Sequence, residues 1–215
     1  MATVLGGSAA VLACVLALTS CTSGGSEAKA ANPCEIRADA QEGALVRGIL
    51  SVESFETKVS KSTSELTDKM RFVLRNMKPG KDSAFNAACT YGSTDGQRDA
   101  RAVFSFGWSP REAVAEPTRP GDSAYDVNGS RATASTTASA LLVQCDLPGD
   151  LAAESRRVWL SADAYFSFTP SAPAADQAAK DRRATLTYLM TRRVTEALAC
   201  ENKPLAQAPV VQPRP

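Results

Sequence analysis

The chain has 215 residues, a formal net charge of +1 and no histidine. Without histidine it cannot carry a Ser-His-Asp or Cys-His nucleophile system, a His-ligated zinc or a histidine pH switch. A charge so close to zero gives no sign of a basic surface, so no nucleic-acid partner is expected.

The chain opens with an uncharged, mostly apolar run over residues 9–19. This run is shorter than the roughly 20 residues of a transmembrane helix and fits the apolar region of a secretory signal peptide. It ends at Leu18-Thr19-Ser20-Cys21, which resembles the lipobox of bacterial lipoproteins, where the cysteine is acylated and the preceding peptide removed. The alternative is a plain secretory signal that is cut elsewhere.

These features predict the organisation of the chain. Residues 1–20 form a signal peptide, residues 21–33 a lipidated cysteine and a small, polar tether, and residues 34–203 a single domain. Residues 204–215 bear prolines and show no periodic pattern, so we expect a disordered tail. Acylated Cys21 would bind membrane lipid and hold the protein on the extracellular face of the cell membrane.

Four cysteines follow the anchor, namely Cys34, Cys89, Cys145 and Cys200. An even number in an exported chain indicates two disulfides, and free buried thiols are the alternative. We favour Cys34–Cys89 with Cys145–Cys200, because both pairs have the same sequence separation and each would join a helical segment to a strand. The nested pairing of Cys34–Cys200 with Cys89–Cys145 is the second choice.

Three helices are expected. Asp39 and Glu42 predict a capping box for the first, and Ser62 and Glu65 a clearer one for the second, which ends at Pro79-Gly80. The third and longest is predicted over 174–200, with an apolar face centred on its leucines. Its arginines are expected on a solvated face; they are Arg182, Arg183, Arg192 and Arg193.

Alternating apolar residues predict strands between these helices. They cover residues 55–59, 87–92, 101–108, 125–127, 130–137, 138–145 and 158–168. Asn128-Gly129 suits a tight hairpin turn, an explanation that we prefer to the glycosylation sequon formed with Ser130. The predicted fold class is α+β: a twisted antiparallel sheet of five to six strands, with two N-terminal helices and one long C-terminal helix packed on it.

Several marks are similar to those of small lipoproteins from high-GC Gram-positive bacteria. They are a lipobox, a polar tether, an Asn-Pro-Cys opening at Cys34, Cys89-Thr90-Tyr91, a strand ending at Cys145 and a helix ending at Cys200. This resemblance implies placement and fold. It implies no catalytic residue, because most of that group has no assigned activity.

We looked for residues that could carry chemistry. Phosphate-binding glycine loops and calcium loops do not occur in the sequence, so no cofactor and no metal are expected. Four acids could in principle serve glycoside hydrolysis, but nothing in the sequence aligns them; they are Asp122, Asp126, Asp146 and Asp163.

Four aromatic residues could line a sugar or peptide groove, namely Trp108, Tyr125, Trp159 and Tyr165. Trp159 and Tyr165 belong to one predicted strand and lie on the face that Val158 does not share. We expect another element of the fold to cover them. The long segment 109–124 is expected to be disordered or a plain surface excursion, and a contact surface is the alternative. The sequence therefore favours a non-catalytic binding or accessory role at the cell envelope, with an unknown protein or glycan as partner. A carboxylate-based envelope hydrolase is the alternative.

Overall fold

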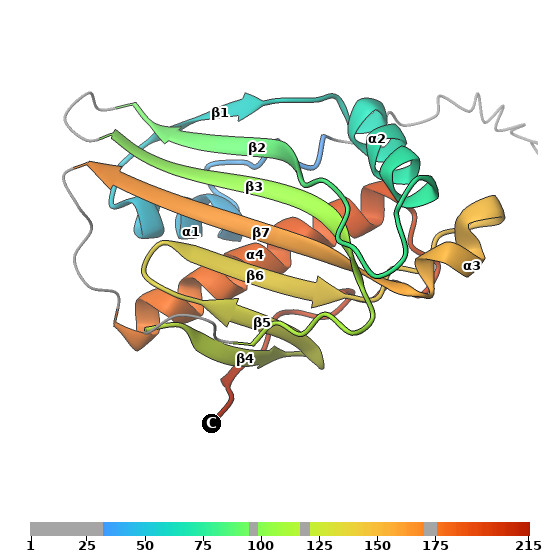
Figure 1. Ribbon diagram of the computed structural model, residues 1–215. Helices are drawn as coiled ribbons and strands as arrows, with labels where there is room; N and C mark the ends of the chain where they lie inside the picture. Colours follow the sequence, from blue (N-terminus) through green and yellow to red (C-terminus); the bar gives the residue numbers. More distant parts are fainter. Residues whose placement is uncertain (1–31, 95–98, 117–120, 170–175) are drawn as a thin grey trace, which may run out of the picture.

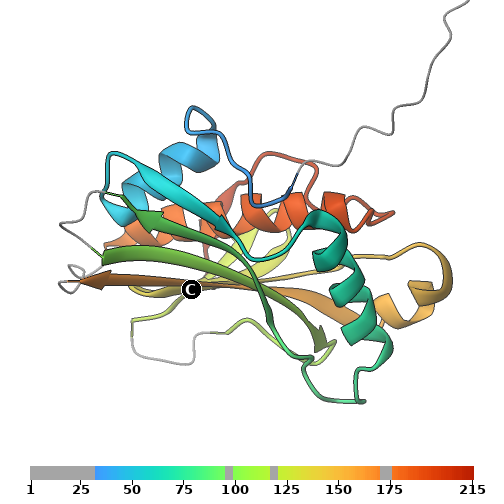
Figure 2. The same cartoon turned by 90° about the horizontal axis from the view of Figure 1, so that it is seen from above.

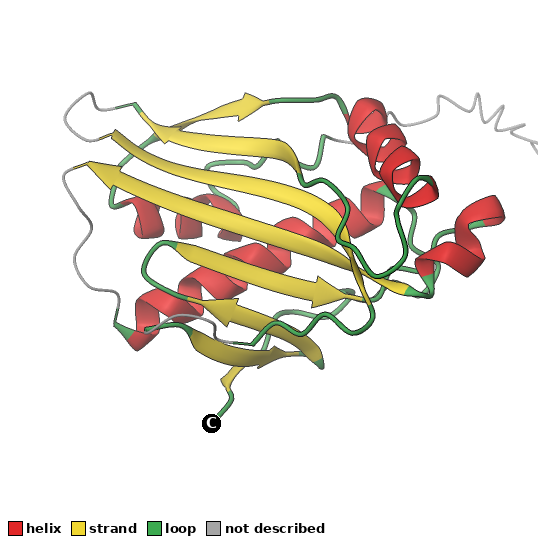
Figure 3. Cartoon of the chain, in the orientation of Figure 1, coloured by secondary structure: helices red, strands yellow, loops and turns green. Residues whose placement is uncertain are grey.

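The computed structural model describes residues 32–94, 99–116, 121–169 and 176–215. Within them, eight strands form one antiparallel sheet, and four helices complete an α+β fold (Figures 1 and 3). The strands are β1 (Phe55–Val59), β2 (Asn86–Ser93), β3 (Asp99–Pro110), β4 (Ser123–Val127), β5 (Ser130–Ala134), β6 (Ala138–Val143), β7 (Val158–Thr169) and β8 (Val211–Pro213). The helices are α1 (Gln41–Leu50), α2 (Thr63–Arg75), α3 (Ala152–Ser155), which follows a short 3-10 turn, and α4 (Gln177–Ala197).

The sheet has the strand order β1-β2-β3-β7-β6-β5-β4-β8. Its centre is the long pair of β3 and β7, which match in register from Asp99 opposite Thr169 to Pro110 opposite Val158. Strand β7 thereby joins two meanders, β1 to β3 on one side and β4 to β6 on the other. The α+β class and the antiparallel sheet are as predicted, whereas the sheet has eight strands instead of five to six.

One face of the sheet carries the core. Phe104, Phe106 and Trp108 on β3 and Phe166 on β7 are fully buried there, as the period-two pattern predicts. Helices α1 and α4 both lie on this face (Figure 2), and α4 packs across β4, β5 and β6. We call this the inner face and the opposite one the outer face.

Helix α2 covers one end of the sheet. Its capping box is present as predicted, with Glu65 N–H donating to the Ser62 hydroxyl and Ser62 N–H to the Glu65 carboxylate. The Trp108 indole N–H donates to the Met70 carbonyl at 2.9 Å, which fixes α2 against β3.

The predicted cap of α1 is wrong. The N-cap residue is Ala40, which makes no side-chain hydrogen bond, and Asp39 instead pairs with Arg37 at 2.8 Å. Glu42 turns inward towards Arg193, with 3.8 Å between the carboxylate and the guanidinium. The spacing of Asp39 and Glu42 fits a capping box, but each carboxylate pairs with an arginine.

Two of the four arginines on α4 are not on a solvated face. Arg183 is only 4% exposed and lies over the rings of Phe166 and Phe168. Arg193 is half-buried and donates to the carbonyls of residues 32, 33 and 35. Burial, followed by the charge of Arg182, lowers the pKa of Arg183.

The predicted disordered tail is also corrected by the structure. Leu205 is buried, and β8 pairs with β4, extending the sheet by one strand. Asn128 has a φ of 51°, and its amide binds the tail twice, donating to the Ala208 carbonyl and accepting from Val210 N–H, both at 2.8 Å. The hairpin turn at Asn128 is as predicted, and its side chain serves to hold the C-terminal segment.

The two disulfides are Cys34–Cys89 and Cys145–Cys200, each with a sequence separation of 55. This is the pairing that the sequence favours. The first ties the start of the domain to β2, and the second ties the segment after β6 to the end of α4.

We expect replacement of both Cys145 and Cys200 by serine to lower the free energy of unfolding by about 2–4 kcal/mol, because an open loop frees the unfolded chain. Urea denaturation with and without the substitutions measures this difference. Non-reducing peptide mapping of the unsubstituted protein should recover Cys145 linked to Cys200. Peptides linking Cys89 to Cys145 would contradict the pairing.

Candidate functional site

The outer face of the sheet is not covered by α1 or α4 and faces the viewer in Figure 1. It holds a groove of about 260 Å³, which we call the outer groove. The groove is lined by Val103, Ser105, Asp122, Thr133, Ser135, Ala138, Ser139, Ala140, Asp163, Ala164 and Tyr165.

Strand register explains why the sheet is hollow here. Asp163 lies opposite Ser105 on β3 and Ala140 on β6, and Ala140 in turn lies opposite Thr133 on β5. Three small neighbours therefore surround one carboxylate. Tyr165 is two residues further along β7 and so projects from the same face beside it.

Asp163 has an unusual electrostatic setting. Burial of the carboxyl, followed by the negative charge of Asp82, raises its pKa to about 6. By surface area Asp163 is an exposed residue, so only part of its carboxyl is shielded; water reaches the group and limits what the shift contributes to stability. A carboxyl with this pKa can hold or release a proton near neutral pH.

The aromatic residues named from the sequence divide between core and surface. Trp108 and Tyr125 are fully buried in the inner core and cannot line a groove. Trp159 lies on the outer face beneath the Arg111 guanidinium, 4.3 Å from its ring centroid. Tyr165 is 58% exposed, so the expectation that another element covers it is wrong.

The four acids named from the sequence also separate. Asp122 and Asp163 line the outer groove together. Asp126 accepts from Gly129 N–H in the β4–β5 turn, and Asp146 accepts from the Gln144 side chain at 2.6 Å. The structure thus brings two of the four acids to one site and assigns the other two to local hydrogen bonds.

The segment between β3 and β4 forms part of the groove wall. It is shorter than predicted, because Ser109–Pro110 belong to β3 and Ser123–Ala124 to β4, and residues 117–120 lie outside the described residues. Lys180 on α4 donates to the Gly121 carbonyl at 2.6 Å. This bond holds the residue next to Asp122 in place.

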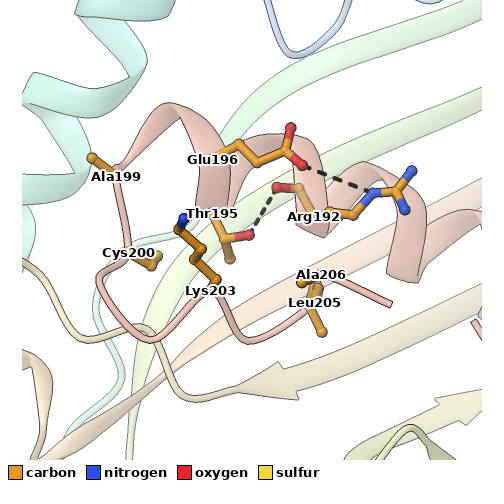
Figure 4. A pocket seen from close by; sticks show the side chains of 8 residues that line it. All are labelled: Arg192, Thr195, Glu196, Ala199, Cys200, Lys203, Leu205 and Ala206. Carbon is orange, nitrogen blue, oxygen red and sulfur yellow. Dashed lines mark hydrogen bonds and ion pairs between the residues drawn. The ribbon is translucent and has the colours of Figure 1, made fainter. Parts of the chain in front are cut away.

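A second cavity of about 360 Å³ lies where α4 meets the C-terminal segment (Figure 4). It is lined by Arg192, Thr195, Glu196, Ala199, Cys200, Lys203, Leu205 and Ala206. Its polar groups largely satisfy one another: Arg192 pairs with Glu196 at 4.0 Å, and the Thr195 hydroxyl donates to the Arg192 carbonyl. The outer groove is smaller, but it is the better candidate because it offers an exposed aromatic ring, hydroxyls and a carboxyl with a raised pKa.

Within the described parts of the chain, no three His, Cys, Asp or Glu side chains lie together in a way that could hold a metal ion. No helix in these parts is long and apolar enough to cross a membrane. The predicted signal peptide, Cys21 and most of the tether lie outside the described residues.

Comparison with known proteins gave no match to any family model, to any curated protein or to any solved structure. The function of the chain must therefore be inferred from its own sequence and geometry.

Sequence reasoning missed the polar residues that complete the groove, namely Ser105, Thr133, Ser135 and Ser139, and the influence of Asp82. A signal for the first two exists, because each occupies the outward position in an alternating strand. The alternation of outward and inward residues does not show which strands are neighbours in the sheet. The set of residues that line the groove could therefore not be predicted from it.

We expect carboxyl NMR to give Asp163 a titration midpoint near 6. Its unfolded pKa is about 4, so the native state retains the proton longer, and the unfolding free energy falls as the pH rises between these values. Asp163→Asn should remove that fall, and Asp82→Asn should lower the midpoint because it removes a like charge. A midpoint near 4 in the unsubstituted protein would contradict the described environment, and Asp68→Asn on α2 serves as the control.

Proposed function

We propose that this protein is a lipoprotein of the cell envelope, anchored through acylated Cys21, that binds a protein or glycan of the envelope in its outer groove without catalysis. The observation that carries the binding role is the groove itself. It combines an exposed tyrosine with hydroxyls and a carboxylate on a sheet face that α1 and α4 leave open. Aromatic rings beside a few polar groups are what peptide and sugar ligands use for binding.

Three features support the placement. The sequence Leu18-Thr19-Ser20-Cys21 follows an apolar run of signal-peptide length. All four domain cysteines are paired in disulfides, which persist in oxidising compartments outside the cytosol. The similarity to small lipoproteins of high-GC Gram-positive bacteria agrees with both, and it remains part of the proposal.

A second candidate is a carboxylate-based envelope hydrolase. The observation in its favour is that Asp122 and Asp163 line one groove and that the pKa of Asp163 is raised, as in a general acid. Against it, the charged neighbour that raises this pKa is Asp82 and not Asp122. A pair of carboxylates facing each other across a substrate is the arrangement that glycoside hydrolysis needs. We therefore favour binding.

A capture experiment with envelope extract tests the binding role. All proteins carry Cys21→Ser, so that they cannot be acylated. Three are immobilised and compared: one with no further change, one with Tyr165→Ala and one with Phe72→Ala. Phe72 is a matched control, because it is exposed to a similar degree and lies on α2, away from the groove. We expect Tyr165→Ala to reduce capture about tenfold, the effect of losing a contact of about 1.4 kcal/mol.

Asp163→Asn separates the two candidates in the same assay. In a binding protein this substitution changes only the amount of ligand captured, because the ligand is never converted. In a hydrolase the substituted protein retains its ligand but no longer converts the captured glycan or peptide. Equal capture by the Tyr165→Ala and Phe72→Ala proteins, or no retained ligand with any of them, would contradict the proposed use of the outer groove.

A further inference from the structure

The outer surface of α2 combines positive charge with an exposed aromatic ring. Residues 61–82 hold six Lys or Arg residues against three acids, a net charge of +3 in a chain whose total is +1. Phe72 is 54% exposed on this surface, with the Lys69 ammonium 5.3 Å from its ring centroid. We call this the basic α2 face; it is defined by Lys61, Lys69, Phe72, Lys78 and Lys81.

The acids of this segment do not cancel its charge evenly. Glu65 is engaged in the cap of the helix, where hydrogen bonds from the backbone and hydroxyl of Ser62 lower its pKa. Asp68 is exposed on the helix. Asp82 lies at the far end, where its charge acts on Asp163 in the outer groove. Arg75 is paired with Asp150 at 2.7 Å, and Glu65 and Asp68 both lie within one helical turn of Lys69. The excess of cations therefore lies at Lys78 and Lys81, beyond the end of the helix.

The described chain begins beside this face. The Asn32 side chain donates to the Lys61 carbonyl at 3.2 Å, immediately before α2. Arg193 holds the Asn32 and Pro33 carbonyls, so this starting point is fixed on the domain. Asn32 follows Cys21 by only eleven positions, a stretch of chain that spans at most about 40 Å.

We propose that the basic α2 face rests on the anionic lipid surface to which the protein is anchored. This inference depends on the proposed acylation of Cys21. An anionic headgroup layer attracts clustered Lys side chains within a Debye length, and an exposed aromatic ring fits the boundary between headgroups and acyl chains. Charge complementarity and the position of Asn32 thus point to the same partner.

Placement on the membrane would also orient the rest of the molecule. Helix α2 covers one end of the sheet, beside the carboxyl end of β3, in both views of the fold (Figures 1 and 2). The outer groove lies on the sheet face, with Tyr165 nearer the opposite end of β7. Asp82, next to Lys81, is near enough for its charge to act on Asp163, so a contact through the basic α2 face leaves open the part of the groove around Tyr165.

The test uses the full acylated chain in vesicles whose lipids carry bromine, which quenches nearby tryptophan. Phe72→Trp reports on the basic α2 face, and Tyr165→Trp, at a similarly exposed position on the outer face, is the matched control. The two native tryptophans, Trp108 and Trp159, contribute the same background to both proteins. Each protein is compared in phosphatidylglycerol and phosphatidylcholine vesicles.

We expect the Phe72→Trp protein to lose emission in brominated phosphatidylglycerol vesicles and the Tyr165→Trp protein to keep it. Adding Lys69→Glu and Lys78→Glu, both at exposed positions, should restore the emission of the Phe72→Trp protein, and Arg131→Glu on β5 should not. Raising the salt from 0.1 M to about 1 M shortens the Debye length to about 3 Å and should also restore it.

Two failures are distinguishable. Equal quenching of the Phe72→Trp and Tyr165→Trp proteins, both acylated and bound to vesicles, would overturn the orientation alone. A protein whose mass shows no acyl group, and which does not remain with the vesicles, would overturn the anchoring and with it the orientation.

Discussion

The constraint on which the rest of the structure depends is the fixing of the chain where it enters the domain. Arg193 donates to the Pro33 carbonyl at 2.8 Å, the Tyr91 hydroxyl donates to the Cys34 carbonyl at 2.9 Å, and Cys34 is bonded to Cys89. Hydrogen bonds from a charged donor stabilise by about 1.5–3 kcal/mol, more than an exposed ion pair gives. Through these contacts α4, β2 and the entering chain form one unit, so the proposed anchor on Cys21 would be connected to the core and not to a loose end.

The two faces of the sheet differ in what covers them. The inner face is closed by α1 and α4, and its large aromatic residues leave no room for a ligand. The outer face is built from small side chains around Asp163, and it stays open because β8 extends the sheet at its edge instead of folding over it. A domain whose entering chain is fixed and whose outer sheet face is open has the geometry that the proposed display of a binding surface requires.

Local patterns predicted what local interactions decide. The Ser62–Glu65 cap, the aromatic alternation of β3 and the tight turn at Asn128 depend on residues a few positions apart, and all three are present. The failures involve partners far along the chain. Arg183 and Arg193 have the periodicity of surface residues, but the rings of β7 and the carbonyls of the first described residues bind them. The tail has no periodic pattern of its own, which predicts disorder. Its short strand forms only because it pairs with β4, a partner that the local sequence does not reveal. For the same reason Asp163 could be named from the sequence, but the groove around it could not.

The central claim is that the domain is displayed from a membrane by a lipid on Cys21. The mass of the native protein's amino-terminal peptide tests this claim most directly. We predict a chain that begins at Cys21 and carries the added mass of a diacylglyceryl group. A soluble mature form that begins at another residue and bears no lipid would contradict the account.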